Sequence, residues 1–121
     1  MAASREFLDF VVEQMAEFGP ATARRMFGGA GIYRDGLMFA LIADDVLYFK
    51  AAPSNSPDFD AEGLEPFIYR AAGGKKTVMS YRRAPERCLE DQDSMVEWCR
   101  KAWTAASERQ EMRRVRKKVT R

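Results

Sequence analysis

Two tight-turn signals within one apolar stretch constrain the fold of this chain more than any other feature. Arg34-Asp35-Gly36 separates the apolar residues 32–33 from 37–42, and Ala43-Asp44-Asp45 separates that second run from residues 46–50. Asp-Gly between β-forming residues is a strong hairpin signal, because Gly and Asp tolerate the positive φ angles of the tightest turns. The stretch therefore predicts three consecutive antiparallel strands.

Signals on both sides of this stretch extend the prediction. Residues 66–70 and 77–82 predict two more strands, and Ser56-Pro57 predicts the start of a short helix before them. Ser4 is a suitable N-cap for a first helix that ends near Gly19-Pro20, and Asp91 or Asp93 is suitable for the last. The expected fold class is α+β, an antiparallel meander sheet of about five strands flanked by an N-terminal and a C-terminal helix.

The segment before the hairpins combines arginines with glycines. Residues 21–26 predict a short helical turn that exposes Arg24 and Arg25, and the glycines that follow favour a close backbone approach at the entry to the sheet over ligand binding. Two adjacent arginines also suit an anion or a carboxylate of a partner, although they fit a solvated pair with stems packed on the sheet as well. The candidate contacts are Arg24, Arg25, Met26, Phe27, Gly28 and Gly29.

Charge is distributed unevenly along the chain. Residues 109–121 hold seven basic residues and one acid, a net charge of +6, so residues 1–108 carry −4. We expect a globular domain over residues 1–108 and a basic C-terminal tail over 109–121, either helical or disordered. Such runs bind nucleic-acid phosphates without base readout, but they also serve as solvated tails. The candidate nucleic-acid contacts are Arg109, Arg113, Arg114, Arg116, Lys117, Lys118 and Arg121.

Residue types that support catalysis or metal binding are scarce. The chain has no histidine, the commonest general base and metal ligand. Cys88 and Cys99 lack zinc-ligand spacing, and we expect them to be buried free thiols. We therefore expect no enzymatic activity, no metal and no cofactor. Without a signal peptide or a membrane-spanning apolar run, the expected location is the cytoplasm.

Several blocks of sequence occur in a characteristic order: GPATARRMFGG at 19–29, GIY at 31–33, DGLMFA at 35–40, LYFK at 47–50, EPFIY at 65–69 and MSY at 79–81. A closing helix follows LED at 89–91. In this order and spacing, the blocks resemble the N-terminal domain of the TfoX/Sxy competence regulators. The resemblance extends over about residues 7–106. It implies a secretion-chaperone-like α–β–α arrangement, in agreement with the order of elements predicted above.

The resemblance also implies a regulatory role. TfoX/Sxy proteins regulate DNA-uptake genes in naturally competent bacteria and are thought to act beside the cyclic-AMP receptor protein. Full-length members have a second, helix-hairpin-helix-like domain, which the resemblance does not include, so we expect a stand-alone N-terminal domain.

Two functions are compatible with these expectations. One is a non-enzymatic regulatory module with a transcription factor such as the cyclic-AMP receptor protein as partner and weak DNA contact through the tail. The other is a purely protein-binding module, chaperone-like or homodimeric.

Overall fold

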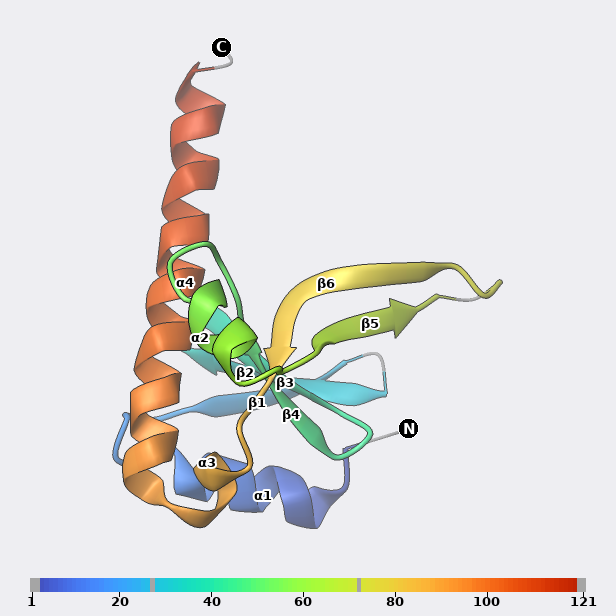
Figure 1. Cartoon of the computed structure of the whole chain (residues 1–121), viewed down its shortest axis with the longest axis vertical. Helices are drawn as coiled ribbons and strands as arrows, with labels where there is room; N and C mark the ends of the chain where they lie inside the picture. Colours follow the sequence, from blue (N-terminus) through green and yellow to red (C-terminus); the bar gives the residue numbers. More distant parts are fainter. Residues whose placement is uncertain (1–2, 27, 72, 120–121) are drawn as a thin grey trace.

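The computed structural model describes residues 3–26, 28–71 and 73–119, and its centre is an open antiparallel sheet (Figure 1). The fold is α+β, as the sequence predicts, with helices at both ends of the chain. The elements are α1 (Arg5–Gln14), β1 (Thr22–Met26), β2 (Gly29–Arg34), β3 (Leu37–Ala43), β4 (Val46–Lys50), α2 (Ser56–Ala61), β5 (Pro66–Arg70), β6 (Lys76–Arg83), α3 (Arg87–Glu90) and α4 (Gln92–Val119).

The strand order in the sheet is β1-β2-β3-β4-β6-β5. The predicted meander is present through β4, but β6 then pairs with β4 and places β5 at the outer edge. Only the C-terminal part of β6 pairs with β4, through Tyr81, Arg82 and Arg83, whereas residues 76–78 pair with β5 alone. The β5–β6 hairpin consequently extends away from the rest of the sheet (Figure 1).

Both predicted tight turns are confirmed. Asp35 and Gly36 have φ angles of 51° and 77°, so the β2–β3 turn has two successive residues in the left-handed region. Asp44 and Asp45 do the same between β3 and β4, with φ angles of 53° and 56°. Turns of this hand match the twist of the flanking strands, and Asp is among the non-glycine residues that tolerate them.

The prediction of a helical turn over residues 21–26 is wrong, because Thr22–Met26 forms the edge strand β1. β1 pairs with β2 in a register that places Arg24 opposite Gly31 and Met26 opposite Gly29. A β-carbon at Gly29 would clash with the carbonyl oxygen of Ile42 on β3. The predicted close backbone approach at the sheet entry is therefore confirmed.

Side-chain caps begin the first and last long helices. Ser4 Oγ accepts a hydrogen bond of 3.1 Å from the backbone N–H of Phe7, and the Asp91 carboxylate accepts bonds from the backbone N–H and the hydroxyl of Ser94. α1 ends at Gln14, and turns continue to Phe18, short of the predicted end at Gly19-Pro20. The apolar stripe of α1 still reaches the core, because Met15 and Phe18 are buried in those turns.

The core lies between the sheet and the helices α1 and α4. Phe39 and Phe49 from the sheet pack in one cluster with Val11 of α1 and with Met95 and Cys99 of α4. The predicted apolar face of the last helix, which also includes Ala102 and Ala106, is buried as expected.

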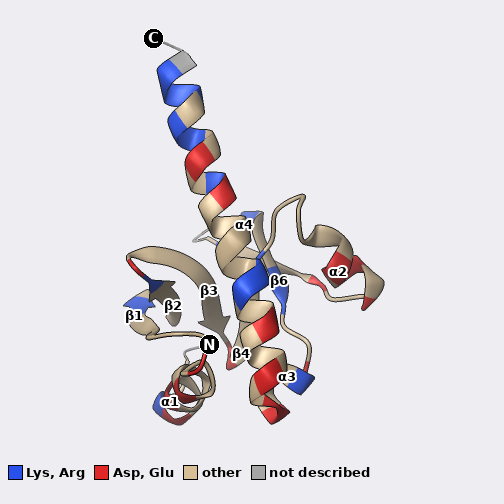
Figure 2. Cartoon of the chain, turned by 90° about the vertical axis from the view of Figure 1, so that its left-hand side faces the viewer, with Lys and Arg blue, Asp and Glu red and all other residues tan. Residues whose placement is uncertain are grey.

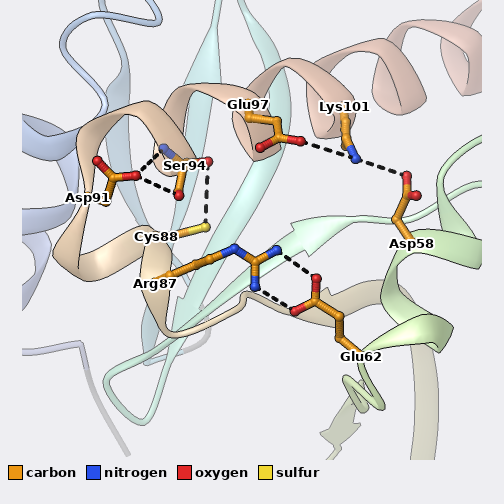
Figure 3. Close-up of polar contacts among 8 residues, drawn as sticks. All are labelled: Asp58, Glu62, Arg87, Cys88, Asp91, Ser94, Glu97 and Lys101. Carbon is orange, nitrogen blue, oxygen red and sulfur yellow. Dashed lines mark hydrogen bonds and ion pairs between the residues drawn. The ribbon is translucent and has the colours of Figure 1, made fainter.

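Ion pairs join α2 to α4 and the end of α2 to α3 (Figure 3). Arg87 binds Glu62 with two hydrogen bonds of 2.7 and 2.6 Å, and this contact joins α3 to the residue after α2. Lys101 lies between Asp58 at 3.3 Å and Glu97 at 3.7 Å. These contacts hold the 51–65 connection against the first half of α4.

Among the described residues, no helix is both long enough and apolar enough to cross a membrane.

Candidate nucleic-acid interface

The last helix continues without a break through the basic segment. α4 extends from Gln92 to Val119, and its C-terminal part projects beyond the body of the domain (Figure 1). Every residue from Glu108 to Lys118 is exposed, whereas Ala105 and Ala106 are buried. Over the described residues, the basic segment is therefore a helical extension that no other element covers. Arg121 lies outside the described residues.

Lys and Arg residues are concentrated at this projecting end (Figure 2). By helical spacing, Arg109, Arg113, Arg116 and Lys117 share one face, Arg114 lies at its edge, and Lys118 lies on the side of Glu111. Acidic residues lie on the other side, at Glu108 and Glu111, and Arg114 forms a long ion pair of 3.8 Å with Glu111. The helix end thus has one continuous cationic face.

Arg109 and Arg113, the first two arginines of this face, also affect the charge of a sheet residue, Lys50. Burial, together with the positive charges of Arg109 and Arg113, lowers the pKa of Lys50, at the end of β4, to about 8. The cationic face is therefore electrostatically coupled to the sheet at Lys50. The basic residues in the last turn of α4 also complement the negative end of its helix dipole, so they favour the helix as well.

This arrangement suits contact with phosphates. An exposed helix with several arginines and lysines on one face neutralises backbone charge and binds independently of sequence. Residues 109–119 include no aromatic side chain on which a base could stack. The helix end therefore has the chemistry for electrostatic binding without base readout.

The second predicted set of contacts is divided between the two faces of β1. Arg24 and Arg25 are neighbours in a strand, so their side chains point to opposite faces. The Arg24 guanidinium lies 5.5 Å from the centre of the Tyr33 ring, and Arg25 Nη1 donates a hydrogen bond of 2.6 Å to the carbonyl of Ala3. The two arginines therefore do not form one anion-binding pair.

The other members of this set lie in two places. The Gly28 carbonyl accepts a hydrogen bond from the backbone N–H of Ala3, whereas Met26 and Gly29 line a pocket together with Arg113 of α4. Phe27 lies outside the described residues. The structure thus brings part of the first predicted set next to part of the second.

Both cysteines are buried free thiols, as expected. Burial raises the pKa of Cys88 to about 12 and raises that of Cys99 as well. A raised thiol pKa opposes formation of the reactive thiolate. Within the part of the chain that the structure describes, no group of three or more Cys, Asp or Glu residues could hold a metal ion.

Sequence reasoning missed Lys50 as a functional candidate. Lys50 is 8% exposed, and it lies on the face of β4 opposite the core residues Leu47 and Phe49. The only sequence signal was that Lys50 follows directly after the apolar residues 46–49. A charged residue at such a position is usually the solvated end of a strand. Its burial depends on β6 and on the pocket, which the local sequence does not show.

The comparisons with known proteins agree with this fold. No curated protein matches the chain. The model of the TfoX N-terminal domain family matches residues 13–106, which include all six strands and the packed half of α4. The chain therefore belongs to the TfoX N-terminal domain family.

Proposed function

We propose that this protein is a non-enzymatic accessory module of transcription regulation that contacts nucleic-acid phosphates through the projecting end of α4. The observation that carries the proposal is the exposure of residues 108–118 combined with five basic residues between 113 and 118. A helix without a packing partner gains little from burial, so its charged face is available to a polyanion. Membership of the TfoX N-terminal domain family supports the regulatory part of the proposal.

The domain body would then serve as the protein-binding part of the module. Its net charge of −4 over residues 1–108 makes it a poor polyanion binder, whereas the helix end is strongly cationic. This polarity would orient the protein on DNA with the helix end toward the backbone. A DNA-bound transcription factor such as the cyclic-AMP receptor protein is the kind of partner that this orientation would serve.

A salt titration tests the nucleic-acid contact. Binding of a short fluorescent DNA duplex would be measured between about 50 and 200 mM salt, where each neutralised phosphate contributes a log–log slope of about −0.9. In the triple variant Arg114→Gln, Lys117→Gln and Lys118→Gln, we expect weaker binding and a slope less steep by up to about 2.7. Arg113 is left in place so that the pocket described below is unchanged.

A charge-matched control makes this experiment specific. The variant Arg5→Gln, Lys75→Gln and Arg100→Gln removes three exposed basic residues away from the helix end, and it should keep the wild-type slope. Equal binding by the two triple variants would show that net charge alone matters. Absence of binding by the wild-type protein at about 50 mM salt would rule the proposal out.

The β5–β6 hairpin favours a second candidate, a purely protein-binding module. Ile68 and Val78 are cross-strand partners, and they are 46% and 67% exposed. β5 is an edge strand, which offers unpaired backbone groups to another chain. If the protein forms a dimer through this edge, the double variant Ile68→Ser, Val78→Thr should be monomeric. Light scattering measures the oligomeric state of both proteins. A strict monomer that captures no partner would count against this candidate.

A further inference from the structure

A pocket of about 580 Å³ lies between the β1–β3 part of the sheet, the β5–β6 hairpin and α4. Its wall is mainly apolar, with Met26, Met38, Leu41, Phe67 and Met79 among the lining side chains. Arg113 of α4 lines it as well. A volume of this size and a largely apolar wall are typical of small-molecule sites in proteins.

Lys50 gives this pocket a buried positive charge. Lys50 lines the pocket although it is only 8% exposed, and its Nζ donates a hydrogen bond of 2.7 Å to Ser80 Oγ. The same Nζ lies 4.9 Å from the centre of the Tyr81 ring. Because Ser80 and Tyr81 both line the pocket too, the ammonium group lies at the pocket wall.

The charge of Lys50 has no acidic counterpart in the pocket. No Asp or Glu is among the described residues that line it, and the second charged residue there, Arg113, is also basic. Ser80 Oγ accepts one of the three N–H bonds that an ammonium group offers. Burial of an ammonium without an anion is unfavourable, and here it lowers the pKa of Lys50 to about 8. An anion bound beside Lys50 would relieve this penalty.

We propose that the pocket binds a small organic acid, with its carboxylate between Lys50 and Arg113 and its apolar part against Met26, Met38 and Leu41. A carboxylate has two oxygens, so it can accept hydrogen bonds from an ammonium and a guanidinium group at the same time. The apolar wall selects an acid with a hydrocarbon chain or ring over a free inorganic ion. The site shares Arg113 with the cationic face, but Lys50 is buried in the domain body, so a Lys50 variant tests the site separately from the proposed DNA contact.

Calorimetric titration with decanoate tests the proposal, with decanol as the uncharged probe of the same chain length. We expect decanoate to bind and decanol to bind at least about tenfold more weakly, as expected for loss of a charge-assisted hydrogen bond. Lys50→Met should weaken decanoate binding about tenfold or more and should leave decanol binding nearly unchanged. Lys76→Met is the matched control, because Lys76 is exposed and is not a lining residue of the pocket.

A second variant, Arg113→Glu, tests the pocket without changing a buried residue. Arg113 is exposed on a projecting helix, so Arg113→Glu should leave the fold intact and should abolish decanoate binding by repelling the carboxylate. Lys50→Met should retain DNA binding, so failure of the pocket and failure of the proposed function would be distinguishable. Equal affinity for decanoate and decanol, or wild-type affinity in both variants, would overturn the proposal, as would absence of decanoate binding.

The pH dependence provides an independent readout. Decanoate affinity should fall as the pH rises above about 8, where Lys50 loses its proton. The other charged or titratable side chains near Lys50 are Arg109 and Arg113 on α4, Tyr81 on β6 and Tyr69 on β5. The arginines keep their charge, and burial raises the pKa of Tyr81 to about 12, so it stays neutral in this range. Affinity independent of pH between 7 and 9.5 would contradict a role for Lys50.

Discussion

The Arg25 guanidinium lies 2.6 Å from the carbonyl oxygen of Ala3, so a side-chain hydrogen bond joins β1 to the residue before the N-cap of α1. The backbone adds a second link, because the N–H of Ala3 donates to the Gly28 carbonyl. Ala3 itself is buried. The first residues that the structure describes are thus held against the edge of the sheet, and one of the two adjacent arginines has a structural role.

Separate alanine variants should distinguish the two arginines. Arg25→Ala removes the bond to Ala3 and should lower the free energy of unfolding by about 1 kcal/mol. Arg24→Ala removes a cation–π contact with the Tyr33 ring and should change the free energy of unfolding by less than about 0.5 kcal/mol. Urea unfolding of both variants measures the difference. Equal effects would mean that the bond to Ala3 contributes nothing to stability.

Gly29 should be intolerant of any side chain. A β-carbon there would clash with the Ile42 carbonyl, which belongs to the backbone and cannot turn aside. Gly29→Ala should therefore destabilise the protein by about 2 to 3 kcal/mol, the cost of overpacking. Gly36→Ala is the control, because nothing surrounds that position and only its positive φ of 77° opposes a side chain, at about 1 kcal/mol. A Gly29→Ala protein that melts like the Gly36→Ala protein would contradict the close approach.

The features that the sequence predicted well are those whose causes are local. The turns at Asp35-Gly36 and Asp44-Asp45 depend on residues that accept positive φ, and the cap at Ser4 depends on a hydroxyl three residues before its donor. The apolar face of α4 was visible from helical spacing alone. In each case, the signal that predicts the feature lies within one short stretch of sequence.

The features that were missed depend on distant parts of the chain. β1 has polar residues at Arg24 and Arg25 and no clear alternation, so only its pairing with β2 makes it a strand. β5 lies outside β6 because β6 is the strand that pairs with β4, and no local signal shows this long-range pairing. Lys50 becomes buried because Ser80 and Tyr81 arrive from β6, thirty residues later.

The two thiols should be inert in the folded protein. Cys88 and Cys99 are fully buried, and burial raises the pKa of both, so little thiolate forms at neutral pH. Reaction with Ellman's reagent at pH 8 should be at least about 100-fold slower in buffer than in denaturing urea, because it requires opening of the core. Rapid labelling of one thiol in buffer would reveal local opening near α3, if Cys88 reacts, or in α4, if Cys99 does.

Lys50 should make the folded protein less stable at neutral pH than an apolar residue would. Its folded pKa of about 8 lies below the ordinary value of 10.5, so the unfolded chain binds the proton more tightly and stability rises with pH between these values. Below pH 8 Lys50 is mostly protonated, so the folded protein contains a buried ammonium group. Lys50→Met should therefore stabilise the protein by about 1 to 2 kcal/mol at pH 7.

This gain should shrink as the pH rises toward 10, because wild-type Lys50 then becomes neutral inside the fold. Urea unfolding of both proteins at pH 7 and pH 10 measures it, and Lys76→Met at the exposed position should show no such trend. A Lys50→Met protein that is less stable than wild type at pH 7 would show that the fold stabilises the ammonium. The pocket would then have no need of an anion.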